Sequence, residues 1–191
     1  MPRHAAEPIR RAAIVKATIQ EVARAGSLEV TVAQIAARAG VSSALAHHYF
    51  GSKEAIFVAA MRHVLTLFGA EVRGALATAD SPRSRIEAIV RASFSAGSFR
   101  REVIAAWLNF YVQAQTTPEA RRLLSLYRKR LHSNLVHSLK PLVGDRAGEV
   151  AEGVGALIDG VYLRQALAGT TPDRRAAADL VLNHVIREIG A

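Results

Sequence analysis

The stretch that most constrains the fold is TVAQIAARAGVSSALAHHYFGSKEAI, residues 31–56. Apolar residues recur three and four positions apart before Gly40, a spacing that predicts an amphipathic helix. Gly40 allows a sharp turn, and Val41 is placed to plug the joint before a second helix begins. The pattern predicts two short helices that cross at a steep angle.

The rest of the chain also favours helix. Half of its residues are hydrophobic, and Ala, Leu, Arg and Glu dominate, whereas β-branched clusters and hairpin turns are scarce. We therefore predict an all-α protein, with a first helix that begins after Pro8 and ends near Gly26. Turn residues separate later helices expected at 53–77, 82–97, 100–114, 118–139, 145–168 and 173–189. This plan indicates a helix-turn-helix domain over residues 1–52 and a helical bundle over residues 53–191.

Charge and composition narrow the classes of function. The formal net charge of +9 favours a polyanionic partner, either nucleic acid or an anionic membrane surface. The absence of cysteine excludes disulfides and thiolate chemistry and fits a cytoplasmic protein. The uncharged run 103–118 is shorter than the roughly 20 apolar residues of a membrane span, so we expect no membrane insertion. No metal-ligand spacing, phosphate-binding loop or nucleophile motif is present, so we expect neither a cofactor nor an enzyme.

One face of the second short helix is not explained by burial. Ala46 and Phe50 lie four positions apart and share the inward side with Val41. The opposite side and its flanks comprise Ser43, Ala44, Leu45, His47, His48 and Tyr49. Small residues let a helix enter a groove, Ser and His can bond to base edges, and Ala or Leu can contact a thymine methyl. Tyr49 and Lys53 suit phosphate contacts, so we predict that this face reads double-stranded DNA.

A single recognition helix reads only a few base pairs, so useful specificity needs two of them about 34–36 Å apart. We therefore expect a homodimer on a palindromic operator. The candidate interface combines the last two helices. The helix at 145–168 carries a stripe formed by Val150, Val154, Leu157, Val161 and Ala168 and broadened by Ile158 and Leu167. The last helix is apolar on more than one side, with Leu180 and Ile186 among its apolar residues. This predicts two packing partners, the core of the chain itself and a second subunit. The alternative is an internal helix of a monomer.

Aromatic residues and one acid form a second candidate site. Trp107 and Tyr111 lie four positions apart on one helix, and Tyr162 lies near Asp159 on another. Aromatic residues at this spacing usually belong to a core, and Asp159 has either an interhelical partner or a bound cation. Ring faces and a carboxylate bind a quaternary ammonium, at about 0.5–2 kcal/mol per ring. These four residues are therefore candidate ligand contacts.

The segments TVAQIAARAGVS and HHYFGSKEAIF, with the amphipathic helix before them, resemble the DNA-binding domain of the TetR family of transcriptional regulators. The resemblance implies that Ser43, Ala44 and His47 approach bases, and that Thr31, Tyr49 and Lys53 anchor phosphates. It also implies a four-helix dimer interface from the last two helices. Ser42 opens the recognition helix and completes the expected DNA contacts. Leu45 stands where many members carry a hydroxyl residue, so we expect apolar contact there.

Further segments, among them AAWLNFYVQA and ALIDGVYLRQALAG, are similar to one branch of that family, the choline-responsive repressors of glycine betaine biosynthesis. This similarity implies repression of genes for choline uptake and oxidation, relieved by choline. The main alternative is a TetR-type repressor of efflux or lipid genes with a hydrophobic effector. A small helical enzyme and a basic DNA protein without sequence preference are further alternatives.

Overall fold

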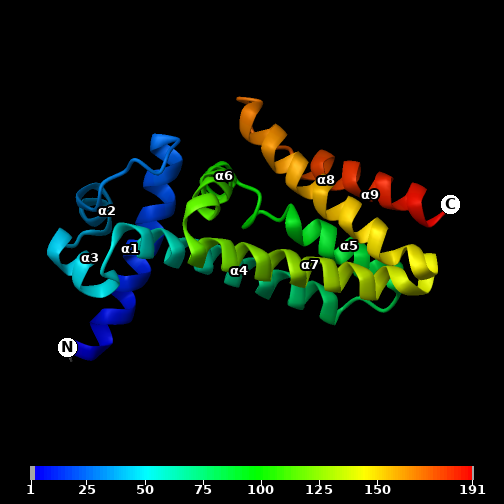
Figure 1. Ribbon diagram of the computed structural model, residues 1–191, viewed down its shortest axis with the longest axis horizontal. Helices are drawn as coiled ribbons and strands as arrows, with labels where there is room; N and C mark the ends of the chain where they lie inside the picture. Colours follow the sequence, from blue (N-terminus) through cyan, green and yellow to red (C-terminus); the bar gives the residue numbers. More distant parts are fainter. Residues whose placement is uncertain (1–2, 191) are drawn as a thin grey trace.

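The computed structural model describes residues 3–190, with side chains from Ala6 onward, and every regular element in that range is helical. The predicted all-α class is therefore confirmed. Figure 1 shows a small unit of three helices at the N-terminal end and an elongated bundle beyond it. The helices are α1 (Arg3–Ala25), α2 (Val32–Ala39), α3 (Ser43–Phe50), α4 (Lys53–Ala77), α5 (Pro82–Ser93), α6 (Arg101–Thr116), α7 (Pro118–Val143), α8 (Ala147–Leu167) and α9 (Arg174–Ile189), with a 3₁₀ turn, η1 (Gly144–Arg146), before α8.

The N-terminal unit packs α1, α2, α3 and the start of α4 around its own core. The core side chains are Ile14, Ala17, Val22, Val30, Ile35, Ala36, Ala46, Ile56 and Phe57, all buried. The buried carboxylate of Glu21 joins two of these helices, because it accepts hydrogen bonds from Arg24 on α1 and from Arg38 on α2. The same two guanidinium groups hold the pKa of Glu21 below its ordinary value. This ion pair fixes α2 against α1 in addition to the apolar contacts.

Local capping sets the boundaries of the short helices. Thr31 caps α2 in a reciprocal box, in which the Gln34 amide N–H donates to Thr31 Oγ1 and the Thr31 N–H donates to Gln34 Oε1. Gly40 ends α2 in the left-handed region, at φ +68°, and the Val41 N–H then donates to the Ala36 carbonyl. Ser42 caps α3 through the Leu45 N–H. The turn between α2 and α3, which the sequence predicted, is therefore stabilised by hydrogen bonds among residues that are close in sequence.

Helix α4 belongs to both parts of the molecule. Ile56 and Phe57 lie in the N-terminal core, whereas Met61, Val64 and Val72 lie in the core of the bundle. Among residues 3–190, α4 is the one helix that is long and apolar enough, by length and composition alone, to cross a membrane. A core helix of a water-soluble protein can meet the same criterion, and α4 contributes side chains to both cores.

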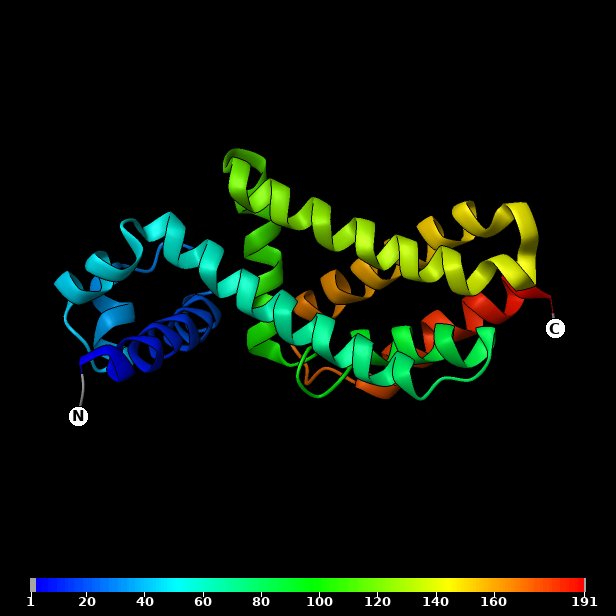
Figure 2. The ribbon, with the colours of Figure 1, turned by 90° about the horizontal axis from the view of Figure 1, so that it is seen from below.

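Helix α6 lies where the N-terminal unit meets the bundle (Figures 1 and 2). It contacts α1 and α4 on one side and α7 and α8 on the other. Phe110 of α6 is buried at this junction and lines a small gap together with Val22 of α1 and Phe57 of α4. A movement of α6 would therefore change its contacts with α1 and α4 directly.

Several helices differ from their predicted ends. Helix α1 begins at Arg3 and continues through Pro8, which removes one backbone donor without ending the helix. Helix α7 likewise extends through Pro141 to Val143. Helix α5 ends at Ser93 rather than at residue 97, because the following loop is held by tertiary contacts. In that loop Phe94 and Phe99 are buried and pack edge to face.

The predicted dimer stripe is partly wrong in its placement. Val150, Val154 and Val161 are buried within the bundle of the chain itself, and Leu157 is half-buried against the same core. Ala168 and Leu167 at the end of the predicted stripe are exposed, and so are Leu163, Leu180 and Ile186. We call Leu163, Leu167 and Leu180 the α8–α9 apolar face. Ile186 instead lines a hollow beside α5, together with Ile86 and Arg91. The period of the sequence alone does not separate the inward stripe from this outer face.

Candidate functional site

Helix α3 carries its polar side chains on the outside. Ala46 has no exposed surface, whereas none of the nine residues predicted to contact DNA is buried. Thr31, Ser42, Ala44, His47 and His48 are exposed, and Ser43, Leu45, Tyr49 and Lys53 are half-buried. These residues lie on α3 and at the N-terminal ends of α2 and α4, and all of them are at least partly accessible. Leu45 is half-buried, and an apolar role for it stays a prediction.

Contacts around α3 hold its reading face in place. His47 Nδ1 lies 3.3 Å from the Gly51 carbonyl oxygen, which leaves Nε2 at the outer end of the ring. The guanidinium of Arg11 lies 5.2 Å from the ring centroids of both Tyr49 and Phe50. Arg11 was not singled out from the sequence. It lies one helix away in space and about forty residues away in sequence, so no local pattern indicates it.

The start of α4 combines a cap, a cation and an acid. Ser52 accepts a hydrogen bond from the Ala55 N–H, and the Nζ of Lys53 lies 5.5 Å from the centroid of the Phe57 ring. Hydrogen bonds from the backbone N–H of Glu54 and from Ser52 lower the pKa of the Glu54 carboxyl. A helix N-terminus with an adjacent ammonium group is suited to a phosphate oxygen.

The second candidate site is an aromatic cluster in the bundle. The ring of Trp107 lies 5.7 Å from that of Tyr111, 4.8 Å from that of Tyr127 and 6.5 Å from that of Tyr162, measured between centroids. Tyr127 lies on α7, and sequence analysis missed it. Its position in the long polar helix α7 gave no periodic signal that would link it to α6. We call Trp107, Tyr111, Tyr127 and Asp159 the effector cluster.

Asp159 brings a carboxylate to this cluster from α8. The Tyr111 hydroxyl donates to Asp159 Oδ1 at 2.8 Å, and Arg128 Nη2 lies 3.7 Å from Asp159 Oδ2. The interhelical partners of Asp159 are therefore a tyrosine on α6 and an arginine on α7. Burial raises the pKa of Asp159, opposed by the Tyr111 hydrogen bond and by the charge of Arg128. Its side chain keeps 29 % exposure, so solutes can reach the carboxylate.

The tyrosines of the cluster remain neutral donors. Burial raises the pKa of Tyr111, and the negative charge of Asp159 raises it further. Burial is also the main reason for the raised pKa of Tyr127. The ring faces lie beside the Asp159 carboxylate, whose charged form is destabilised by burial. Such a site favours binding of a cation over binding of an anion.

Tyr162 lies at the back of the cluster and has a clear structural role. Its hydroxyl donates to the carbonyl oxygens of Ser93 and Ser98, and its ring packs against Phe94 and Phe99. It therefore joins α8 to the loop between α5 and α6. A ligand role for Tyr162 stays a prediction that uses its ring, because its hydroxyl is already occupied.

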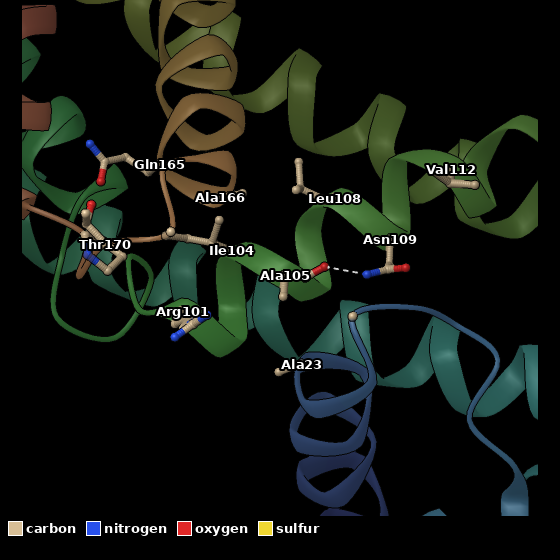
Figure 3. Close-up of a pocket in the computed structure, with 13 residues that line it drawn as sticks. Ala23, Arg101, Ile104, Ala105, Leu108, Asn109, Val112, Gln165, Ala166 and Thr170 are labelled. Atoms are coloured by element: carbon tan, nitrogen blue, oxygen red, sulfur yellow. Dashed lines mark hydrogen bonds between the residues drawn. The ribbon is translucent and has the colours of Figure 1, made fainter.

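A separate pocket of about 410 Å³ lies between the end of α1, the outer side of α6 and the end of α8 (Figure 3). Arg101, Leu108, Asn109 and Gln165 are among its walls, and the Asn109 amide donates to the Ala105 carbonyl. Among the residues that the structure describes, no aromatic ring and no carboxylate lines this pocket. Its chemistry does not fit a quaternary ammonium, which favours the effector cluster as the site for such a cation.

An exposed recognition helix on a three-helix unit, joined by one long helix to a bundle, defines a helix-turn-helix regulator. Residues 14–60 match the bacterial regulatory proteins of the tetR family, and residues 82–190 match the C-terminal region of BetI-type transcriptional repressors. The chain belongs to the TetR family of transcriptional regulators, with a C-terminal region of BetI type. It is a transcriptional regulator, as the family resemblance implied.

Similar proteins agree with this assignment over nearly the whole chain. The HTH-type transcriptional regulator BetI of Brucella anthropi is 49 % identical over 97 % of this chain and 96 % of its own. The regulator of the same name from Rhizobium meliloti is 44 % identical over 97 % of this chain and 92 % of its own. A transcriptional regulator of Saccharomonospora viridis, solved in complex with choline, shares the fold, with a TM-score of 0.80 and 24 % identity over 93 % of this chain and 95 % of that one.

Proposed function

We propose that this chain is a cytoplasmic, homodimeric repressor of genes that convert choline to glycine betaine, and that choline releases it from a palindromic operator. Relatives named BetI at 44–49 % identity support the assignment to this branch, and a choline complex of a protein with the same fold supports the ligand. The observation that carries the proposal is the effector cluster, in which the half-buried carboxylate of Asp159 accepts a hydrogen bond from Tyr111, whose ring packs with those of Trp107 and Tyr127 in one aromatic cluster.

The chemistry of the cluster suits a trimethylammonium group. Such a group cannot donate a conventional hydrogen bond, so ring faces and a nearby negative charge provide its attraction. The carboxylate of Asp159 is destabilised by burial and only partly compensated by Tyr111 and Arg128. A bound cation supplies the missing compensation, and the hydroxyl of choline finds donors and acceptors in the Tyr111–Asp159 pair.

Helix α6 provides a short path from the cluster to the DNA-binding unit. Trp107 and Tyr111 lie on the side of α6 that faces the cluster, and Phe110 between them lies at the junction with α1 and α4. A ligand that shifts α6 therefore acts on the position of α1 and α3. The shift can be no larger in free energy than the difference between the affinities of choline for the two states.

A second connection runs through the loop between α5 and α6. The Glu71 carboxylate of α4 accepts hydrogen bonds from Ser95 at 2.6 Å and from Ser98 at 2.8 Å. A Cβ atom at Gly97 would lie 2.5 Å from Glu71 Oε1, so glycine allows this close approach. Because Tyr162 holds the same loop from α8, the loop couples the back of the cluster to α4, the helix that carries α3.

The proposal is tested by titrating choline into the complex of the purified protein with the DNA upstream of its own gene. We expect choline to release the DNA, and 3,3-dimethylbutan-1-ol, its uncharged analogue, to have no effect at the same concentration. Asp159→Asn keeps the shape of the side chain and removes the charge. It is expected to weaken choline binding by about tenfold or more, as for the loss of a charge-assisted contact, while DNA binding without choline stays intact.

Unchanged operator affinity at millimolar choline would refute the choline assignment. Release by an uncharged hydrophobic compound, with no response to choline, would instead support a repressor of efflux or lipid genes. Equal binding to unrelated duplexes would indicate a DNA protein without sequence preference, since only a specific reader distinguishes one palindrome from others.

A further inference from the structure

A second and larger hollow lies on the other side of Tyr127, between α4 and α7. Figure 2 shows these two helices running along the length of the bundle. The hollow has a volume of about 740 Å³, within the range of small-molecule sites. We call it the α4–α7 groove. No motif in the sequence indicates it, and the proposed regulation by choline does not use it.

The rim of the groove is strongly basic. Arg62 and Arg73 line it from α4, and Lys129 and Arg130 line it from α7. No acidic residue is among its lining residues, and within residues 3–190 none of these four cations has a carboxylate within 4.0 Å. The nearby acid on α4, Glu71, is instead occupied by two serine hydroxyls. The groove therefore presents four uncompensated positive charges in one concave surface, which attracts an anion.

The floor of the groove is apolar. Leu65 and Phe68 of α4 and Leu123 and Tyr127 of α7 are half-buried in it, and Leu126 is 46 % exposed at its edge. An inorganic anion would bind the basic rim but leave the apolar floor in contact with water. A polynucleotide carries many charges but little apolar surface with which to cover the floor. The apolar floor and the basic rim therefore fit a molecule that has both a hydrocarbon chain and a negative charge.

We propose that the α4–α7 groove binds a soluble, single-chain amphipathic anion, such as a medium-chain carboxylate. Arg62 and Arg73 are eleven positions apart, about 16 Å along α4, so the groove accommodates an extended chain and not only a headgroup. The cations hold the carboxylate, and the floor residues cover the chain. This site goes beyond the proposed response to choline and does not depend on it.

The groove and the effector cluster share one side chain. Tyr127 lines the groove, packs against Phe68 at 5.6 Å, and packs against Trp107 at 4.8 Å between ring centroids. A chain in the groove therefore contacts the wall of the cluster. Trp107 is the single tryptophan of the protein, so its fluorescence reports occupancy of the groove through Tyr127.

The test compares three probes with the same tail, dodecanoate, dodecanol and dodecanamide, each below its aggregation concentration, by calorimetry and by Trp107 emission. We expect saturable binding of dodecanoate at least tenfold tighter than that of either other probe. Arg62→Gln with Arg130→Gln should raise the Kd for dodecanoate at least tenfold, which corresponds to about 1.4 kcal/mol. The matched control, Arg83→Gln with Arg122→Gln, removes two exposed charges outside the groove and should leave this Kd unchanged.

A second variant tests the floor. Leu126→Glu places a negative charge at an exposed position of the groove, where folding tolerates it, and should also abolish the preference for dodecanoate. Equal affinity for the three probes would overturn the proposal, as would an equal effect of the two double variants. Sedimentation with phosphatidylglycerol vesicles, without saturable binding of free dodecanoate, would overturn it as well, because it would indicate a membrane surface as the anion.

Discussion

The DNA-binding surface and the effector cluster present their polar groups in opposite ways. On α3 the functional side chains come from one eight-residue helix and its neighbours, and they lie at the surface. In the effector cluster they come from α6, α7 and α8, and they are half-buried or buried. Burial raises the pKa values of Tyr111, Tyr127 and Asp159 in the effector cluster.

Because of this difference, we expect DNA binding to depend mainly on salt concentration and effector binding to depend mainly on pH. Exposed cations that meet phosphates release counterions, so binding of DNA depends on salt concentration. A half-buried carboxylate that meets a cation depends on its own ionisation, so binding of the effector depends on pH. The two regions are joined by α4 and α6, and the predictions below perturb either region, or the pairing of two chains, separately.

The largest effect is expected from separating two chains. Leu163→Glu with Leu180→Glu places two charges on the α8–α9 apolar face, at side chains that are 48 % and 47 % exposed. If this face joins two chains, the variant is a monomer, and operator affinity falls by about a hundredfold or more because two recognition helices no longer bind together. Sedimentation velocity and DNA titration measure both outcomes. Val112→Glu, at an exposed apolar residue of α6, is the matched control and should remain a dimer. A double variant that is still dimeric would show that the α8–α9 apolar face is not the dimer interface.

Two substitutions on the DNA-binding surface should differ in kind. If His47 faces the bases as predicted, discrimination between the operator and a mutated operator should fall by about 1–3 kcal/mol in His47→Ala. If Lys53 contacts a phosphate as predicted, Lys53→Ala should lower affinity for all sequences alike, and the slope of log K against log salt should decrease by about one. Both are measured by fluorescence anisotropy at several salt concentrations. A loss of sequence discrimination in Lys53→Ala would mean that Lys53 contacts a base. An equal loss of affinity for all sequences in His47→Ala would mean that His47 contacts only the DNA backbone.

The sequence could predict the N-terminal unit because its determinants are local. Thr31, Gly40 and Ser42 set helix ends within four residues of themselves, and Ala46 lies inward by simple helical spacing. The same reasoning identifies the outer face of α3, although it does not find Arg11, whose contact with Tyr49 crosses between helices.

The effector cluster depends on tertiary packing, so the sequence could predict it only in part. Trp107 and Tyr111 share a helix and an evident spacing, but Tyr127 and the partners of Asp159 lie on other helices. The stripe containing Val150 and Val154 shows the same limit. Its period correctly indicates a packed face, and only the fold shows that the partner is the bundle of the chain itself.

The pH dependence of choline binding should distinguish the cluster from the DNA-binding surface. The pKa of Asp159 is raised by burial, so on acidification this group is protonated at a higher pH than an ordinary aspartate. Choline favours the ionised form, so affinity should rise with pH through that pKa and become constant above it. Below it, affinity should fall by about tenfold per pH unit. Calorimetry from neutral to acidic pH measures this, and the weaker binding by Asp159→Asn should be independent of pH.

The smallest effect is expected from Arg128, which we expect to compete with choline for the carboxylate of Asp159. Its guanidinium lies 3.7 Å from Asp159 Oδ2 and is 61 % exposed, so solvent screens the attraction. Arg128→Gln should therefore tighten choline binding by only about two- to fivefold at low salt, and the gain should shrink at high salt. Arg122→Gln, on the same helix without a contact to Asp159, should leave choline affinity unchanged. Weaker binding by Arg128→Gln would mean that Arg128 instead orients Asp159 for the ligand, and the effector cluster would then require the ion pair rather than compete with it.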